Sequence, residues 1–293
     1  MWQRYIFKDK NFVKCLSGDN VRSRLRNKIK LDFKETEDWW ELVSPQEVID
    51  SVTDIDCAKK QIKDISWIWN FKNLEWLNLW CNQLTALPEE MNNLINLNNL
   101  DLSRNNFTIF PKEIENLKNL ESLNLCNNKL TILPEGIKNL TKLKYLDLSE
   151  NYLTVLPREI GDLKNLRKIN LKDNQLIDLP IEIWNLENLE LFALSKNKLT
   201  ELPKEIWNLK NLKDLWVGDN NLTTLPVEIK NLKNLKYLDL EWNPKLWNLN
   251  RYLKYKDITE YCGKVIDTDG DWINDTCLCI QGNWKYLKLW IEK

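Results

Sequence analysis

The sequence predicts an α/β solenoid, in which one short unit of strand, bend and helical turn repeats along the chain. In residues 143–165, LKYLDLSENYLTVLPREIGDLKN, apolar and polar residues alternate at Leu146–Leu148 with the period of a β-strand. Pro157 then precedes Ile160 and Leu163, whose spacing of three is typical of a helical turn. The same register begins every 23 residues, at Leu74, Leu97, Leu120, Leu143, Leu166, Leu189, Leu212 and Leu235.

Each unit places apolar residues in fixed slots, which we number from its first residue as offset zero. In the unit that begins at Leu143, the apolar slots hold Leu143, Leu146, Leu148, Leu153, Leu156, Ile160 and Leu163. An asparagine stands at offset eight of every full unit, at Asn82, Asn105, Asn128, Asn151, Asn174, Asn197, Asn220 and Asn243. A buried bend leaves backbone groups that need partners, and an Asn amide both donates and accepts. We therefore expect this column to be structural.

A degraded copy of the unit precedes the first full one. It begins at Val52 and is 22 residues long, with Lys60 in the Asn slot and Ser66 in the Pro slot. We therefore divide the chain into three parts. These are an N-terminal flanking segment and cap (1–51), a solenoid (52–243) and a C-terminal segment (244–293), whose residues 245–256 we expect to close the solenoid.

The repeats resemble the leucine-rich repeat family, close to its 23-residue class LxxLxLxxNxLTxLPxEIxNLxN, over about residues 52 to 243. The resemblance implies a leucine-rich repeat horseshoe with a parallel β-sheet on the concave face. It also implies short helical or 3₁₀ turns on the convex side. The function that it implies is non-catalytic binding of a protein or peptide on the concave face.

Two local patterns predict structure before the first repeat. Ile29, Leu31 and Phe33 alternate with polar residues, which indicates a strand. Residues 44–47, Ser-Pro-Gln-Glu, have the pattern of a capping box with Pro at the first helical position. We expect a short helix that ends before Val52. The segment as a whole should cover the exposed edge of the first rung.

Composition excludes several classes of function. The net charge of −1 and the estimated pI of 5.9 indicate neither a nucleic-acid partner nor an anionic membrane partner. There is no run of about 18 apolar residues, so we expect no transmembrane segment, and the N-terminus lacks the apolar core of an export signal. The absence of histidine removes Ser–His and Cys–His catalysis. We expect a monomer that is not an enzyme.

The seven cysteines are odd in number and irregular in spacing. Cys57 occupies an apolar slot, so we expect it to be a small core residue. Cys277 and Cys279 are separated by one residue, which is not the spacing of a zinc site.

Tryptophan is unusually common and glycine unusually rare, at 15 and 7 residues. Gly161, at offset eighteen, is matched by Trp184 and Trp207 in similar contexts, while Trp242 and Trp272 stand where related motifs carry Gly. We interpret these tryptophans as UGA codons that the source reads as Gly. The alternative is that they are genuine aromatic side chains, with Trp184 and Trp207 stacked on neighbouring rungs. Peptide masses of the natural protein distinguish the two.

The concave face is the expected binding surface. Side chains at offsets two, four and six alternate away from the leucine core. Because strands stack about 4.8 Å apart, eight rungs give a surface roughly 35–40 Å long, which suits a folded protein or an extended peptide. The candidate ligand-binding residues are Tyr145, Asp147, Lys168, Asn170, Lys172, Trp216, Tyr237 and Asp239.

A second candidate functional feature, after the concave face, is the acidic motif DTDGDWIND at residues 267–275. It resembles the thrombospondin type 3 calcium repeat and, more distantly, an EF-hand loop. The resemblance implies a calcium site with the ligands Asp267, Asp269, Asp271 and Asp275. Alternate carboxylates on a curling backbone converge as this hard cation requires. The segment departs from the motif at slot six, Trp272, and at slot twelve, Leu278. The alternative is an acidic surface loop.

Together these patterns predict a protein-binding module at the cell surface or outside the cell, because weakened calcium ligand sets suit extracellular calcium concentrations. One alternative is an intracellular signalling scaffold, which the absence of an export signal and the unpaired cysteines favour. Another alternative is a fragment of a larger enzyme or effector whose catalytic part is absent. About 50 residues follow the solenoid in this sequence, which is too few for a catalytic domain.

Overall fold

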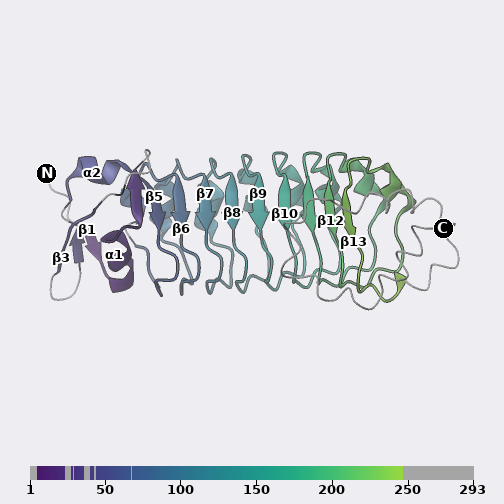
Figure 1. Ribbon diagram of the computed structural model, residues 1–293, viewed down its shortest axis with the longest axis horizontal. Coiled ribbons are helices and arrows are strands. Elements are labelled where there is room, and N and C mark those ends of the chain that lie inside the picture. Colours follow the sequence, from purple (N-terminus) through teal and green to yellow (C-terminus); the bar gives the residue numbers. More distant parts are fainter. Residues whose placement is uncertain are drawn as a thin grey trace.

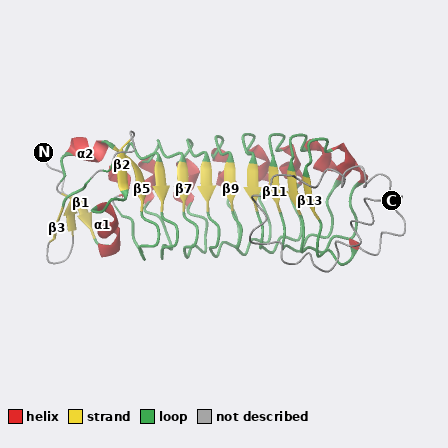
Figure 2. Cartoon of the chain, in the orientation of Figure 1, coloured by secondary structure: helices red, strands yellow, loops and turns green. Residues whose placement is uncertain are grey.

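The protein is an elongated solenoid in the computed structural model, which describes residues 5–23, 28, 30–35, 40–42, 44–66 and 68–246. Successive rungs lie side by side along the long axis, with the strands on one face and the helical turns behind them (Figures 1 and 2). The solenoid predicted from the period of 23 residues is therefore confirmed.

Each rung from that of β5 to that of β12 contributes one short strand and one 3₁₀ helix, and β13 is the last strand of the described residues. The strands of the solenoid are β5 (Val52–Asp56), β6 (Trp76–Asn78), β7 (Asn99–Asp101), β8 (Ser122–Asn124), β9 (Tyr145–Asp147), β10 (Lys168–Asn170), β11 (Leu191–Ala193), β12 (Asp214–Trp216) and β13 (Tyr237–Asp239). The 3₁₀ helices are η1 (Ile68–Asn70), η2 (Glu89–Asn93), η3 (Lys112–Asn116), η4 (Glu135–Asn139), η5 (Arg158–Asp162), η6 (Ile181–Asn185), η7 (Lys204–Asn208) and η8 (Val227–Asn231). Each proline of the Pro column precedes its 3₁₀ helix as an extended N-cap residue; Pro157, for example, has φ −69° and ψ 148°.

The solenoid strands pair in parallel and in register. On β10, Lys168 is opposite Tyr145 of β9 on one side and Leu191 of β11 on the other, and all three residues stand at offset two. Equal offsets of successive rungs therefore form straight columns across the sheet. This register turns every slot of the repeat into a row of neighbouring side chains.

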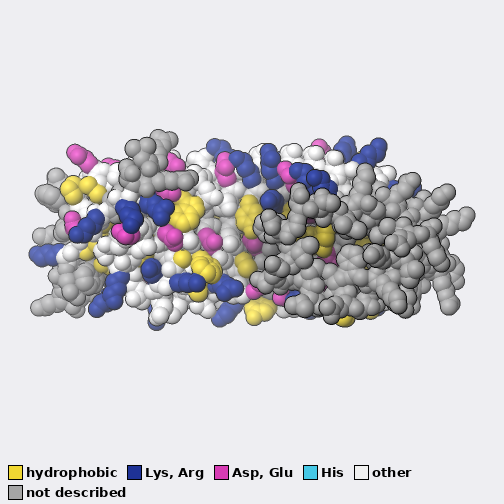
Figure 3. Space-filling model, viewed as in Figure 1, with side chains coloured by type: hydrophobic (Ala, Val, Ile, Leu, Met, Phe, Trp, Pro, Cys, Tyr) yellow, Lys and Arg dark blue, Asp and Glu magenta, His cyan; other side chains and the backbone are white. Residues whose placement is uncertain are grey.

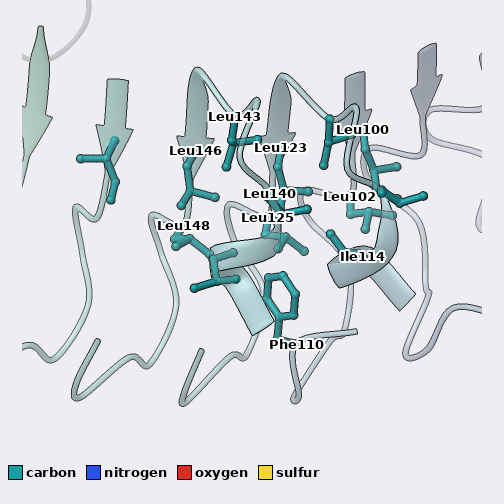
Figure 4. Packing of buried hydrophobic residues seen from close by; sticks show 14 of the residues in the cluster. Leu100, Leu102, Phe110, Ile114, Leu123, Leu125, Leu140, Leu143, Leu146 and Leu148 are labelled. Atoms are coloured by element: carbon teal, nitrogen blue, oxygen red, sulfur yellow. The ribbon is translucent and has the colours of Figure 1, made fainter. Parts of the chain in front are cut away.

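The apolar slots form one continuous core. In the unit that begins at Leu143, six of the seven slot residues are 0% exposed and Leu156 is 7% exposed. The slot residues of the degraded copy, from Val52 to Phe71, are at most 1% exposed. Figure 4 shows leucines of neighbouring rungs in contact behind the strands. The predicted core residues are confirmed.

The asparagines at offset eight link each rung to the one before it. Asn151 Nδ2 donates to the carbonyls of Leu125 (3.0 Å), in the preceding rung, and of Leu148 (3.1 Å), in its own. Its Oδ1 accepts from the N–H of Leu130 at 3.0 Å, again in the preceding rung. The same pattern recurs from Asn82 to Asn243. The column is structural, as expected.

A second asparagine column, at offset twenty-two, was given no role in the sequence analysis. Asn165 Nδ2 donates to the carbonyl of Thr141 at 2.7 Å, and Asn188 donates to that of Lys164 at 2.9 Å. Both bonds join one rung to the preceding one, but they are exposed to solvent. This column therefore fastens the edge of the solenoid more weakly than the buried one.

The N-terminal segment covers the first rung. The strand β2 (Val21–Ser23) pairs antiparallel with β5 and completes a ten-stranded sheet. The helix α1 (Lys10–Leu16) is capped by Asp9, and its buried Cys15 forms a disulfide with Cys57. Cys57 is thus a buried core residue, but it is also covalently joined to the cap.

The rest of the N-terminal segment contains a short helix and a small sheet. The helix is α2 (Gln46–Asp50), and a separate antiparallel sheet comprises β1 (Tyr5–Phe7), β4 (Trp40–Leu42) and β3 (Phe33–Glu35). The predicted helix before Val52 is confirmed. Its capping box is not, because Pro45 is the N-cap and makes no side-chain cap bond. The hydroxyl of Ser44 instead accepts from the N–H of Asp32 at 2.8 Å.

The two tryptophans at offset eighteen have different surroundings. Trp184 is fully buried, 6.0 Å from the Phe192 ring between centroids, and its Nε1 has no hydrogen-bond partner. Trp207 is 42% exposed, with the Lys210 ammonium 5.8 Å from its ring. At Gly161 a Cβ would lie 2.3 Å from the carbonyl oxygen of Glu182. Glycine in place of Trp184 would remove an unpaired buried indole N–H, which costs about 1–3 kcal/mol. That these tryptophans are UGA codons read as Gly in the source stays a hypothesis.

Asn151→Ala should lower the free energy of unfolding by about 1–3 kcal/mol, because it leaves the buried N–H of Leu130 without its acceptor. The carbonyls of Leu125 and Leu148 each lose one donor but keep the amide of Asn128 or Asn174. Asn165→Ala, which removes a single exposed bond, should cost less than about 1 kcal/mol. Denaturant unfolding followed by circular dichroism measures both. Equal midpoints for the two variants would contradict the assigned role of the buried column.

Candidate functional site

The candidate site is the concave sheet face, formed by side chains at offsets two, four and six. Figure 3 views this face and shows hydrophobic side chains flanked by Lys and Arg side chains over the N-terminal strands. Seven of the eight candidate residues lie on β9, β10, β12 and β13, and Lys172 lies two residues after the end of β10. In-register pairing brings those of adjacent rungs together, while the rung of β11 separates the two groups.

Asp147 is a structural centre of this face, and its side chain is buried. Its Oδ1 accepts from the N–H (2.9 Å) and hydroxyl (2.6 Å) of Ser149. Its Oδ2 accepts from the Tyr145 hydroxyl at 2.9 Å and from Asn170 Nδ2 at 3.0 Å. Burial, and then the neighbouring Asp147 carboxylate, raise the pKa of the Tyr145 phenol. Four donors satisfy the Asp147 carboxylate, so little of its charge is left for a partner.

Other residues at offset four have the same role. Asn170 Oδ1 accepts from the N–H of Lys172 at 3.1 Å, and Asn124 Oδ1 accepts from that of Cys126 at 3.0 Å. Asp or Asn at this slot thus fixes the end of the strands that carry it, whereas β11 and β12 have Ala193 and Trp216 there. Asn170 and Asp147 position the face, whereas the side chains of Lys168 and Lys172 project from it, exposed and half-buried respectively.

The C-terminal rungs carry an aromatic pair beside carboxylates. The rings of Trp216 and Tyr237 meet edge to face with centroids 6.1 Å apart, and Tyr237 is 41% exposed. Burial raises the pKa of Asp214, of Asp239 and of Glu241. The neighbouring carboxylates Asp239 and Asp219 further raise the pKa of Glu241. This end of the face therefore holds negative charge that nearby cations neutralise only in part.

Gly218 opens a gap in the offset-six column at this end. A Cβ at this position would come within 2.7 Å of Asp239 Oδ2. The Asp239 carboxylate instead occupies the space beside Gly218. The hydroxyl of Ser195, two rungs away, lies 3.5 Å from Asp239 Oδ2. The glycine therefore allows a carboxylate to lie flat against the sheet rather than to project from it.

The sequence analysis missed a group at the N-terminal end of the same face. Trp76 and Trp80 stand at offsets two and six of the β6 rung, and both are half-buried. The Lys59 ammonium lies 4.4 Å from the centroid of the Trp80 ring, and the Arg104 guanidinium carbon lies 5.9 Å from it. The alternation rule would have found both tryptophans. We call Lys59, Trp80 and Arg104 the Trp80 cluster.

The described face shows no arrangement suited to nucleophilic catalysis. Cys126, at offset six of the β8 rung, carries a free thiol. Burial, which outweighs a hydrogen bond with Ser149, raises the pKa of this thiol to about 11. At neutral pH it is therefore a thiol rather than the reactive thiolate. A shallow recess of about 330 Å³ at the sheet edge, lined by Glu75, Asn96, Asn98, Asn119, Glu121 and Lys142, is polar throughout, unlike most ligand pockets.

The described residues contain neither a cluster suited to a metal ion nor a helix suited to a membrane. Within the described ranges, no group of three or more Asp, Glu, His or Cys residues is placed to hold a metal ion. The predicted calcium ligands Asp267, Asp269, Asp271 and Asp275 lie outside the described residues. In the part of the chain that the structure describes, no helix has the length and apolar character needed to span a bilayer.

Comparison with protein families gave one match. A family model for the leucine-rich repeat region matches residues 50–149 and 137–248. Comparison with curated proteins gave no match.

Several solved structures are similar to this chain. A leucine-rich repeat protein of Leptospira interrogans is 35% identical, with a TM-score of 0.56 over 68% of this chain and 57% of its own. The plant peptide hormone receptor RGFR1, in complex with RGF2, is 29% identical, with a TM-score of 0.55 over 68% of this chain and 37% of its own.

Two further structures extend the comparison. The ectodomain of the Arabidopsis thaliana receptor kinase GASSHO1/SCHENGEN3, in complex with Casparian strip integrity factor 2, is 30% identical, with a TM-score of 0.60 over 68% of this chain and 25% of its own. Internalin C2 of Listeria monocytogenes, at 23% identity and a TM-score of 0.66, covers 80% of this chain and 96% of its own and supports the fold alone. The chain thus spans 57%, 37% and 25% of the three more identical structures.

Proposed function

The chain belongs to the leucine-rich repeat family, and we propose that it binds a protein or an extended peptide on its concave sheet face. The observation that carries this proposal is the face itself. Partly exposed aromatic and charged side chains, from Trp80 to Tyr237, are spread along a rigid in-register sheet rather than gathered in one pocket. Aromatic and charged anchors on such a surface are typical of protein interfaces.

Similar proteins support the same conclusion. Two of the similar structures are plant receptors solved in complex with RGF2 or Casparian strip integrity factor 2, and the first is a peptide hormone receptor. We propose that Lys168, Lys172, Trp216 and Tyr237 contact the partner directly, together with the accessible part of Asp239. Tyr145, Asp147 and Asn170 act mainly by holding these strands in place, because their polar groups bond to one another.

We propose that the chain works at the cell surface or outside the cell. The buried Cys15–Cys57 disulfide supports this, since structural disulfides persist in oxidising compartments. An intracellular scaffold is the second candidate, which the free thiols of Cys81 and Cys126 favour. Alkylating the thiols of intact source cells before lysis tests the compartment. Recovery of Cys15 and Cys57 as alkylated thiols would contradict a surface location.

We also propose that residues 267–275 bind calcium, on the evidence of the alternating carboxylates in the sequence. Calcium at about 1 mM should raise the melting temperature of the full chain, since a ligand that binds only the folded state stabilises it. Asp267→Asn together with Asp269→Asn should abolish this shift. An equal shift in the variant, or none in the wild type, would contradict the site.

Replacing exposed residues of the concave face should prevent partner binding without unfolding the protein. Lys168→Glu together with Tyr237→Ala should reduce recovery of the partner at least about tenfold, because charged and aromatic anchors dominate interfaces. The assay is affinity capture from the natural source with wild-type and variant bait, at matched unfolding midpoints.

A matched control is Lys204→Glu, the same charge reversal on η7, behind the sheet. It should leave capture unchanged. Capture that survives the concave-face variant but is lost with Lys204→Glu would place the binding surface on the other side of the solenoid.

A further inference from the structure

The Trp80 cluster is produced by the repeat itself. Lys59 and Arg104 both stand at offset seven, in the rungs on either side of the Trp80 rung. This offset has a left-handed backbone in every rung, with φ of 57° at Lys59 and 53° at Arg104. Both side chains are exposed, and both cations approach the same ring. Two positive charges therefore flank one indole on the partner-facing side of the sheet.

These two charges are not neutralised by ion pairs among the described residues. The carboxylates at the ends of the two adjoining strands already accept hydrogen bonds from other residues. Asp56 Oδ1 accepts from Asn78 Nδ2 at 3.0 Å, and Asp101 accepts from Ser103 and from Asn124. A cation–π contact at an exposed site is weak, so both cations remain able to bind an anion.

We propose that the Trp80 cluster binds a carboxylate side chain of the protein or peptide on the concave face. This inference rests on the proposed function and adds the chemistry of the partner. An Arg guanidinium can hold both oxygens of a carboxylate, and a Lys ammonium adds a further donor. The indole between them offers an apolar platform for the methylene groups of a glutamate. Together the two cations and the indole can recognise both the carboxylate and the methylene groups of an acidic side chain.

A dense polyanion fits this surface less well. Asp56 and Asp101 lie on the adjoining strands, and the chain as a whole carries a net charge of −1. Nucleic acids are bound by extended basic surfaces that neutralise many phosphates. Two cations among carboxylates instead suit one or two carboxylate groups.

The charges at the opposite end of the face indicate in which orientation a partner would bind. The aromatic pair there, Trp216 and Tyr237, lies among Asp214, Asp239 and Glu241. The β6 and β12 rungs are six rung spacings apart, or about 29 Å. A partner would therefore lie with an acidic segment over β6 and a basic or neutral segment over β12, and reversing it would bring like charges together.

The test follows the indole N–H of Trp80 by NMR, in the full chain with ¹⁵N-labelled tryptophan and with Trp80→Phe to assign the signal. The probes are end-blocked tetraglutamate and end-blocked tetraglutamine. Tetraglutamate should shift the Trp80 signal saturably, and tetraglutamine should not. Lys59→Gln together with Arg104→Gln should weaken the apparent affinity roughly tenfold, because both exposed charges are lost.

The matched control is Lys196→Gln, which removes a lysine at the same offset and backbone conformation in another rung, where φ is 58°. It should leave the titration unchanged, and all variants are compared at matched unfolding midpoints. Three outcomes would overturn the proposal: no tetraglutamate shift up to about 10 mM, an equal tetraglutamine shift, or an undiminished shift in the double variant. Saturation by inorganic phosphate or an oligothymidylate at lower concentration than tetraglutamate would overturn the carboxylate as ligand.

Failure here is distinguishable from failure of the proposed function. If the Trp80 signal does not respond but capture still depends on Lys168 and Tyr237, the face binds a partner and only the carboxylate site is wrong. If the Trp80 signal responds but capture is indifferent to the concave face, the anion site exists and the proposed function is wrong.

Discussion

The structure depends on the buried amide of the asparagine at offset eight. Each amide satisfies carbonyls of two rungs and accepts one backbone N–H, as Asn151 does with Leu125, Leu148 and Leu130. A bend packed against leucines has no water to satisfy these groups, and an unpaired buried group is costly. The amide therefore fixes both the bend and the distance to the previous rung, and the parallel register of the strands follows from that.

Register in turn determines what the concave face can present. Since equal offsets form columns, a polar residue at offset four meets another polar residue on the next strand, as Asp147 meets Asn170. The polar groups of these offset-four residues then bond to each other and are not available to a partner. In the β9 and β10 rungs, binding is therefore left to the slots on either side, such as those of Lys168 and Lys172. In the β12 rung, offset four instead holds Trp216, which remains available to a partner. The rigidity of the sheet means that a partner meets preordered side chains, which lowers the entropic cost of binding.

Much of this fold could be predicted from the sequence because its information is periodic. Leucine spacing fixed the rung, the core and the outward offsets. Non-periodic contacts could not be predicted in the same way. The partner of Cys57 is Cys15, 42 residues away in a helix outside the repeat. Ser44 has the sequence of a cap but bonds to the N–H of Asp32, a tertiary contact that no local pattern encodes.

The sequence could predict which surface is the candidate site, but not which of its side chains are available to bind a partner. Asp147 looked like a free charge because its four donors come from two strands and become neighbours only in register. The Trp80 cluster was missed for a related reason. Offset seven is a turn position, and its left-handed backbone, seen here at Lys59 and Arg104, is not encoded by glycine in any rung.

Only some residues distinguish this solenoid from any other with the same consensus. The repeated slots cannot, since an apolar residue at offset three or asparagine at offset eight serves the same purpose in every full rung. Specific recognition must come from slots where the rungs differ. Among the full rungs, offset six holds Trp80, Cys126, Lys172, Gly218 and Glu241 in place of the serine of the other rungs. At Trp80 the change adds a half-buried aromatic ring, and at Gly218 it removes a side chain and makes room for the Asp239 carboxylate. A partner that reads both departures must span the rungs between them, which a small metabolite cannot do and an extended chain can.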